Sequence, residues 1–180
     1  MRRTFSALVL TLGCFAAPLA GADVNLTGTH WERVARQHGL DARVLYAVAL
    51  QESRKARGSS RTSPWPWTIR SPEGSRFFDS RGEAASELNR LVGAYRPWTI
   101  DVGIMQVNLG WHGHKVADPA FLLDPKVNLQ IAAAILQEAL ASAPGDPELA
   151  VGRYTTYTEA KARSYGRQVL RVLAALGGHL

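Results

Sequence analysis

The residue best suited to acid–base chemistry is a glutamate within an apolar helical pattern. Glu52 follows Leu45 by seven residues, Val48 by four and Ala49 by three. Helical spacing places its carboxyl on the apolar face, where desolvation raises the pKa and permits proton donation near neutral pH. The same spacing also fits a helix that ends near Ser53 and leaves this carboxyl in solvent. Periodicity alone leaves both interpretations open.

A second unusual segment lies at residues 101–108, where two amides interleave with apolar residues in the run DVGIMQVN. Gln106 and Asn108 carry donors and acceptors suited to the hydroxyl and acetamido groups of a sugar. Gly103 would allow the backbone to approach a ligand closely. Taken alone, however, such a pattern more often marks a buried turn whose amides are satisfied within the protein.

Two further sets of side chains are candidates for ligand binding. His112 and His114 lie close together, but no third ligand has a spacing suited to a metal ion, so we expect no metal site. Trp65, Trp67 and Trp98 could stack on sugar rings. They could equally pack a proline-rich insertion onto the domain.

The residues around Glu52 predict a mostly helical framework. Thr29 opens a capping box and begins a helix that Gly39 ends. Asp41 caps the next helix, which carries Glu52 and runs to about Ser53.

Further helix starts follow along the chain. Ser80 and Glu83 form a second capping box, which opens a helix to about Val92. Three later segments open with Asp-Pro, which places a capping carboxylate before a proline in the first turn. They begin at Asp118, Asp124 and Asp146.

Between residues 53 and 101 the composition changes to Gly, Ser, Pro and Arg. Residues 64–70 and 76–78 flank a Ser-Pro-Glu-Gly-Ser turn, which predicts a β-hairpin between helices. We therefore predict a mostly α (α+β) fold in a single domain at residues 23–180, with an insertion at about residues 55–100.

The N-terminal segment predicts export to the periplasm. Two arginines precede an apolar run at residues 5–19, and small residues follow it. This is typical of a secretory signal peptide at residues 1–22, cleaved after about Ala22. The run is too short for a membrane-spanning helix, which needs about 20 apolar residues. Lipid attachment at Cys14 is an alternative, but apolar sequence continues past it, which favours ordinary cleavage.

Charge and cysteine content narrow the chemistry. The formal net charge is +6 and falls to +4 when Arg2 and Arg3 leave with the signal peptide, which is basic enough to favour an anionic wall or membrane surface. Charge would also permit nucleic acid, but export argues against that partner. Cys14 is the single cysteine and leaves with the signal peptide, so the mature chain has no thiolate nucleophile, disulfide or cysteine metal ligand.

Three ordered motifs resemble those of one family. They are Ala49-Leu50-Gln51-Glu52-Ser53, then Gly103-Ile104-Met105-Gln106-Val107-Asn108, then Asn128 in Asn128-Leu129-Gln130-Ile131-Ala132-Ala133. Through them, residues 29 to about 175 resemble the soluble lytic transglycosylase (SLT) domain. The Pro-Trp-Pro-Trp-Thr segment and the wide gap between Glu52 and Gln106 resemble the subgroup attached to type IV secretion and integrating conjugative elements.

This resemblance implies a fold, a substrate and partners. The fold is lysozyme-like, of the goose-type or SLT kind, with helices around a cleft and a small hairpin insertion. The substrate is the glycan strand of peptidoglycan, no cofactor is needed, and secretion or conjugation machinery is the implied partner.

The resemblance also implies roles for particular residues. Glu52 becomes the general acid and base. The family's Ala-Tyr-Asn-Ala-Gly motif is matched only by Tyr154, because Thr155 and Thr156 follow it. The asparagine through which the family makes further contacts is therefore missing here. The implied substrate-binding residues are Ser53, Gly103, Met105, Gln106, Asn108, Tyr154 and Tyr165, although Tyr165 could equally be a core residue.

The implied reaction uses one carboxyl group. Most glycosidases need two, and here only Glu52 is convincingly placed. It would protonate the leaving oxygen and then deprotonate the muramyl C6 hydroxyl, giving an anhydromuramyl end without water. Two alternatives stay open: a lysozyme-type hydrolase in which Asp101 activates water, and an inactive wall-binding assembly module of a secretion system.

Overall fold

The computed structural model describes residues 24–57 and 61–180, so the predicted signal peptide and Cys14 lie outside the described residues. Within these ranges the chain is mostly α-helical with two small antiparallel sheets. This confirms the predicted mostly-α, α+β fold. None of the helices in the described ranges is long and apolar enough to cross a membrane.

The first two helices begin at the predicted caps. α1 (His30–Gln37) starts after Thr29, whose hydroxyl accepts a hydrogen bond from an amide of the first turn (3.4 Å). α2 (Ala42–Ser53) starts after Asp41, whose carboxylate accepts a first-turn amide in the same way (2.6 Å). Gly39 follows the C-cap of α1 and has a φ of 63°, a left-handed conformation that stops the helix.

α2 is enclosed on nearly all sides and contacts both α1 and α7. An apolar helix that is buried all round has no solvent face on which a terminal side chain could lie. The last turn of α2 therefore carries Glu52 into the interior. The buried residues of α2 are Val44, Leu45, Ala47, Val48, Ala49, Leu50 and Ser53.

The later helices also begin largely where the sequence predicts. Ser80 caps α3, Asp124 caps α5 and Asp146 caps α6. The segment after Asp118 forms a 3₁₀ helix instead of an α-helix, because the cap of α5 follows within one to two turns. The bounds are α3 (Arg81–Ala94), η3 (Pro119–Leu123), α5 (Pro125–Ala141), α6 (Pro147–Gly152) and α7 (Glu159–Ala175), with short helices η1 (Pro97–Thr99), α4 (Leu109–His112) and η2 (Gly113–Lys115).

The predicted hairpin is present, but it is one part of a larger β structure. β3 (Thr68–Ser71) and β4 (Gly74–Phe77) pair across the predicted turn. β5 (Asp101–Val102) and β6 (Val107–Asn108) extend this sheet in the order β4-β3-β5-β6. A separate hairpin joins β1 (Arg54–Arg57) to β2 (Arg61–Pro64).

The prediction of a single hairpin was therefore incomplete. The run at residues 101–108 was interpreted as a possible buried turn, and it is a turn flanked by two strands. Its strands are only two residues long, so no alternating pattern exists that could have revealed them.

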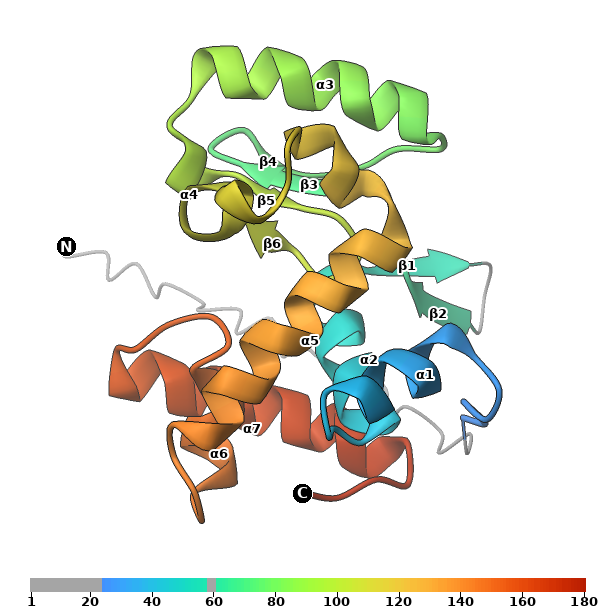
Figure 1. Cartoon of the computed structure of the whole chain (residues 1–180), viewed down its shortest axis with the longest axis vertical. Coiled ribbons are helices and arrows are strands. Elements are labelled where there is room, and N and C mark those ends of the chain that lie inside the picture. Colours follow the sequence, from blue (N-terminus) through green and yellow to red (C-terminus); the bar gives the residue numbers. More distant parts are fainter. Residues whose placement is uncertain (1–23, 58–60) are drawn as a thin grey trace, which may run out of the picture.

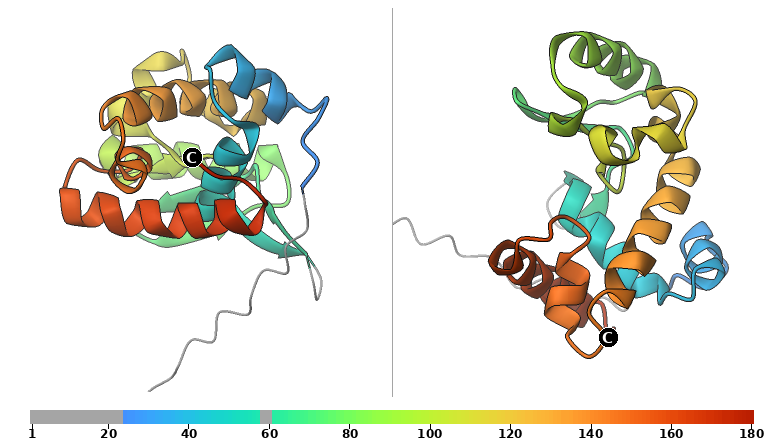
Figure 2. Two further views of the ribbon diagram at one scale, coloured as in Figure 1. Left: turned by 90° about the horizontal axis from the view of Figure 1, so that it is seen from below. Right: turned by 60° about the vertical axis from the view of Figure 1, so that its left-hand side comes forward.

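α5 runs through the middle of the molecule between two groups of elements (Figure 1). The four-stranded sheet, α3 and α4 lie at one end, and α6 and α7 lie at the other. Two further views keep this arrangement, with α2 beside α5 (Figure 2). The C-terminal end of α2 points toward the sheet, so Glu52 lies where the two groups of elements face each other.

One buried side chain of α5 holds the turn between β5 and β6. Asn128 is fully buried, and its Oδ1 accepts a hydrogen bond from the Met105 amide (2.8 Å). Its Nδ2 donates to the carbonyls of Val102 (2.8 Å) and Leu122 (2.9 Å). These bonds supply partners for main-chain groups in the interior and join the turn and η3 to α5. Asn128 therefore fixes the second motif to α5.

We predict that Asn128→Leu lowers the free energy of unfolding by about 3 kcal/mol, because an apolar side chain of similar size removes three hydrogen bonds to main-chain groups in the interior. Urea denaturation measures this change. Gln130→Leu, an exposed substitution on the same helix, is the control and should change stability by less than about 0.5 kcal/mol. Equal effects of the two substitutions would contradict the role of Asn128.

Candidate active site

Glu52 lies partly buried at the end of α2, and its Oε1 accepts a hydrogen bond from the Tyr165 hydroxyl. Burial raises the pKa of Glu52 from 4.5 to about 7. The hydrogen bond from Tyr165 and the charge of Arg70 oppose this rise, whereas the charge of Asp101 adds to it. Of the two interpretations left open by the sequence, the structure supports the carboxyl on the apolar face.

Tyr165 reaches Glu52 because α7 packs closely on α6. At Gly166, a Cβ atom would lie 1.9 Å from the carbonyl oxygen of Glu148, so only glycine permits this approach. Burial, followed by the negative charge of Glu52, raises the pKa of Tyr165 well above its ordinary value. The phenol therefore stays protonated and donates to the carboxyl group.

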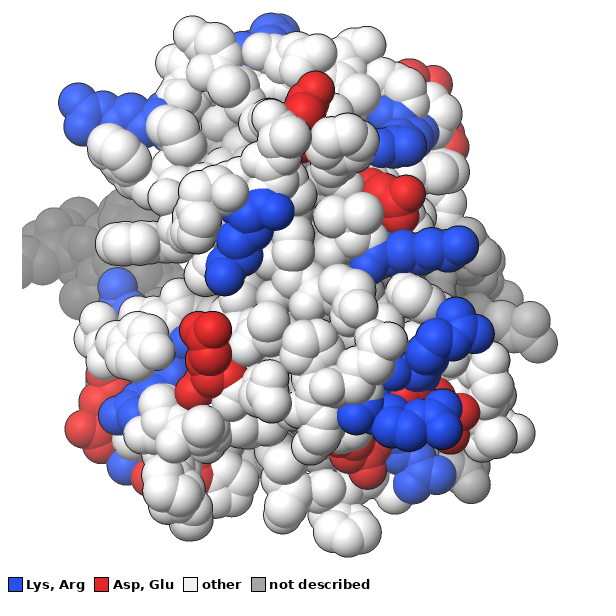
Figure 3. Space-filling view, in the orientation of Figure 1, with Lys and Arg blue, Asp and Glu red and all other residues white. Residues whose placement is uncertain are grey.

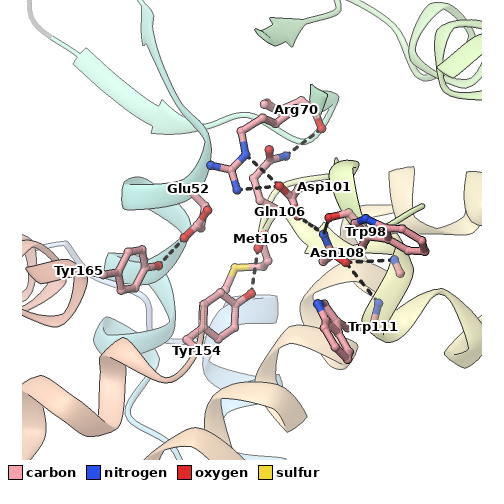
Figure 4. Close-up of polar contacts among 12 residues, drawn as sticks. Glu52, Arg70, Trp98, Asp101, Met105, Gln106, Asn108, Trp111, Tyr154 and Tyr165 are labelled. Atoms are coloured by element: carbon pink, nitrogen blue, oxygen red, sulfur yellow. Dashed lines mark hydrogen bonds and ion pairs between the residues drawn. The ribbon is translucent and has the colours of Figure 1, made fainter. Parts of the chain in front are cut away.

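Tyr154 lies at the end of α6 and faces the same site. Its hydroxyl donates to the Met105 carbonyl (2.8 Å). Burial and the charge of Glu52 raise the pKa of this phenol well above its ordinary value too. Two protonated phenols therefore flank the region of Glu52, one bonded to the acid and one to the second motif (Figure 4).

The turn of the second motif is fixed by its own side chains. Gly103 has a φ of 85°, and a Cβ atom there would lie 2.4 Å from the amide nitrogen of Asn128. The backbone at Gly103 therefore lies so close to the Asn128 side chain that only glycine fits there. Gln106 also has a positive φ, 49°, and its Nε2 donates to the carbonyls of Thr68 (3.0 Å) and Gly103 (2.8 Å). The Gln106 amide nitrogen is therefore used inside the protein, as in a turn with satisfied amides.

Ser53 joins α2 to this turn. Its hydroxyl is buried, donates to the Ile104 carbonyl (2.6 Å) and accepts a hydrogen bond from the Trp65 amide (3.2 Å). Both contacts are with main-chain atoms of other elements. The geometry gives Ser53 a positioning role beside Glu52.

Asn108 forms hydrogen bonds through both ends of its side-chain amide. Its Oδ1 accepts the first-turn amides of α4, at 3.0 and 3.2 Å. Its Nδ2 donates to the carbonyl of Trp98 (3.0 Å) and to Oδ1 of Asp101 (2.8 Å). The other oxygen of Asp101 accepts from Nε and Nη2 of Arg70, at 2.8 and 2.6 Å. Both oxygens of the Asp101 carboxylate are therefore engaged.

Arg70 was missed by sequence reasoning. It pairs with Asp101 because β3 and β5 are neighbours in register, with Arg70 opposite Asp101. The two residues lie 31 positions apart, and a two-residue strand carries no sequence signal of its pairing. The sequence offered two clues. Arg70 lies in the predicted hairpin, and an acidic residue, Asp101, begins the segment at residues 101–108 further along the chain.

The structure brings most of the predicted site residues together. Glu52, Met105, Gln106, Asn108, Tyr154 and Tyr165 lie around one region, with Arg70 and Asp101 between them (Figure 4). Trp65 and Trp67 instead pack edge to face at 6.0 Å, and Trp65 donates to the Phe78 carbonyl (2.6 Å), so they hold the hairpin.

The histidines form no metal-binding arrangement. Within residues 24–57 and 61–180, no group of three or more His, Cys, Asp or Glu side chains is placed to hold a metal ion. His112 has a lowered pKa, mainly because it is partly desolvated.

The arrangement defines a single-carboxyl acid–base site. A glutamic acid with a pKa of about 7 is partly protonated near neutral pH, so it can donate a proton and later accept one. Tyr165 can stabilise the anion between these two events through its hydrogen bond. The other carboxyl group among these residues is that of Asp101. Both of its oxygens accept hydrogen bonds, one from Arg70 and one from Asn108.

Comparison with known proteins agrees with this class of site. The family model described as the transglycosylase SLT domain matches residues 29–169, so the chain belongs to the SLT transglycosylase family. Membership implies lytic transglycosylase activity on peptidoglycan. No curated protein and no solved structure matches the chain.

The pKa of Glu52 predicts how cleavage depends on pH. An acid that must be protonated loses activity as the pH rises through its pKa, here about 7. Tyr165→Phe removes a hydrogen bond that favours the charged form, so the pKa of Glu52 should rise and the loss of activity should move to higher pH. The pH dependence of kcat/KM on purified peptidoglycan measures this shift.

Tyr154→Phe is the matched control, because the Tyr154 hydroxyl bonds to the Met105 carbonyl and not to Glu52. In this variant, kcat/KM should fall at the same alkaline pH as in the wild type. If kcat/KM of Tyr165→Phe falls at the same pH as in the wild type, or at a lower pH, Glu52 is not the titrating acid.

Proposed function

We propose that this chain is a peptidoglycan lytic transglycosylase that cleaves the MurNAc–GlcNAc bond without water and leaves anhydromuramyl ends. The observation that carries the proposal is the raised pKa of Glu52, next to an Asp101 whose two oxygens are already engaged. One carboxyl group must then serve as both acid and base.

The first step uses the protonated form of Glu52. Its proton passes to the glycosidic oxygen as the bond from muramyl C1 breaks, and the GlcNAc leaves as an alcohol. The substrate's own acetamido group stabilises the positive centre at C1. Glu52 is now a carboxylate, and the hydrogen bond from Tyr165 stabilises this charge.

The second step restores the acid. The Glu52 carboxylate removes the proton of the muramyl C6 hydroxyl while that oxygen bonds to C1. The product is the 1,6-anhydro ring, and Glu52 ends protonated as it began. No water and no net proton are consumed, so the cycle needs no second carboxylate.

The hydrolase alternative requires a base that activates water. Asp101 was the candidate, but its side chain is only 11% exposed and forms an ion pair with Arg70 (2.6 Å). Both of its oxygens already accept hydrogen bonds, one from Arg70 and one from Asn108, so a water would have to compete with these partners. The geometry therefore favours the lyase over the hydrolase.

The inactive-module alternative rested on Thr155 and Thr156. The Thr155 hydroxyl donates to the Gly152 carbonyl (3.2 Å), which closes the end of α6 locally. Tyr154, just before it, still reaches the Met105 carbonyl. The departure from the family motif thus leaves the contacts of Glu52 with Tyr165 in place, which supports an active enzyme.

We predict that Glu52→Gln abolishes wall cleavage, lowering kcat by at least about 10³-fold, because Gln can neither donate nor accept the proton. Mass spectrometry of muropeptides released from purified wall should show anhydromuramyl ends with the wild type and none with the variant. Reducing ends from the wild type would instead establish a hydrolase, and equal release by Glu52→Gln would refute the role of Glu52.

Stability provides the folding control for this variant. The pKa of Glu52 rises from 4.5 to about 7 on folding, so ionisation destabilises the folded state by about 3 kcal/mol once the pH exceeds 7. Because the unfolded chain ionises first, stability falls between about pH 4.5 and pH 7. Glu52→Gln should therefore be more stable than the wild type at pH 8 and similar at pH 4.

We also propose that the chain is exported through the signal peptide at residues 1–22, acts in the periplasm, and opens the wall locally for a secretion or conjugation apparatus. Support for export comes from the arginines and apolar run at the N-terminus. Support for the apparatus is the resemblance of the Pro-Trp-Pro-Trp-Thr segment.

Cell experiments test both parts of this proposal. Mass determination of the periplasmic protein should give an N-terminus near Asp23, and Cys14→Ser should not change its release; a lipid-modified Cys14 would contradict cleavage after Ala22. Replacing the wild type by Glu52→Gln should reduce secretion or transfer by the host's apparatus. Unchanged transfer would remove the link to that machinery.

A further inference from the structure

Two exposed tryptophans line a pocket beside the acid–base site. Trp98 and Trp111 are 55% and 73% exposed, and with Gly110 they enclose a volume of about 340 Å³. Neighbouring exposed apolar side chains that share a pocket often mark a binding site. Figure 4 shows both indoles beside Asn108, on the side away from Glu52.

The main-chain segments that carry the two tryptophans are held in place. The amide of Asn108 donates to the Trp98 carbonyl (3.0 Å) and accepts from the Trp111 amide (3.2 Å). At Gly110, a Cβ atom would lie 2.6 Å from Cα of Trp98, so glycine allows η1 and α4 to touch. The backbone thus fixes the positions from which the two indoles extend toward one pocket.

The same asparagine connects this pair to the acid–base site. Its Nδ2 also donates to Asp101 (2.8 Å), and Asp101 binds Arg70. The charges of Arg70 and Asp101 both act on Glu52. A ligand on the tryptophans would therefore lie at a fixed position relative to the acid.

We propose that Trp98 and Trp111 form a glycan subsite that takes one pyranose ring of the strand that Glu52 cuts. This inference rests on the proposed function. A pyranose has apolar C–H faces, which suit the face of an indole, and polar edges, which suit a pocket open to solvent. The guanidinium of Arg96 lies over the Trp98 ring, 5.2 Å from its centroid, in a cation–π contact.

The size of this pocket favours a sugar over a protein partner. The pocket lies at the lower end of the range for small-molecule sites, which suits one ring and not a protein interface. Lys and Arg are scattered among Asp and Glu on the face of the molecule shown in Figure 3, without a single basic patch there. Stacking on aromatic rings needs no such patch.

Binding to a non-cleaving protein tests the subsite. In the Glu52→Gln background, the probes are peptide-free glycan strands from amidase-treated wall, and chitohexaose. Trp98→Ala and Trp111→Ala should each raise the dissociation constant about tenfold, and Trp98→Phe should restore much of the loss. Neither Ala substitution removes the main-chain contacts to Asn108, so the fold is retained.

Phe121→Ala is the matched control, since Phe121 is also exposed (48%) but lies in η3. It should change binding by less than about twofold. In the cleaving enzyme, Trp98→Ala should raise KM with little change in kcat and no change in the pH dependence that reports Glu52.

The outcomes separate the subsite from the proposed function. Unchanged binding in both Ala variants overturns the subsite, even if the wild type releases anhydromuramyl ends. Loss of binding in both variants supports the subsite, even if the wild type proves to release no such ends. Loss of affinity for a helical peptide or for anionic vesicles, with glycan binding retained, would assign the tryptophans to another partner and overturn the inference.

Discussion

The site depends on a buried amide that satisfies three main-chain groups at once. Asn128, on α5, accepts from the Met105 amide and donates to the carbonyls of Val102 and Leu122. With the turn fixed in this way, its own carbonyls become acceptors for other elements: Ile104 for the hydroxyl of Ser53 and Met105 for that of Tyr154. One asparagine thereby sets the meeting point of α2, α5, the sheet and the end of α6.

Around this point the protein keeps a carboxyl group where it is poorly solvated. Burial disfavours the charged form of Glu52, and the hydrogen bond from Tyr165 together with the charge of Arg70 only partly offsets this effect. The acid is therefore balanced near neutral pH. This balance lowers stability at high pH and is the property that a single-residue acid and base requires.

Much of the helical framework could be predicted because its signals are local. The caps at Thr29, Asp41, Ser80, Asp124 and Asp146 each lie within three residues of the amides that they bind. The turn between β3 and β4 is equally local. The partners of Gln106 and Asn108 could not be predicted in this way, because an amide side chain binds a sugar or a carbonyl equally well, and only the folded neighbours decide which.

The sequence by itself determined the helices, the glutamate within an apolar stripe and, through three ordered motifs, membership of the SLT family over residues 29–169. These depend on spacing along the chain. The tertiary structure alone decided that the Glu52 carboxyl is buried and bonded to Tyr165, that Arg70 engages Asp101, and that Trp98 and Trp111 share a pocket. Each of these contacts joins residues from different elements, so its energy depends on packing and not on the local pattern of the chain.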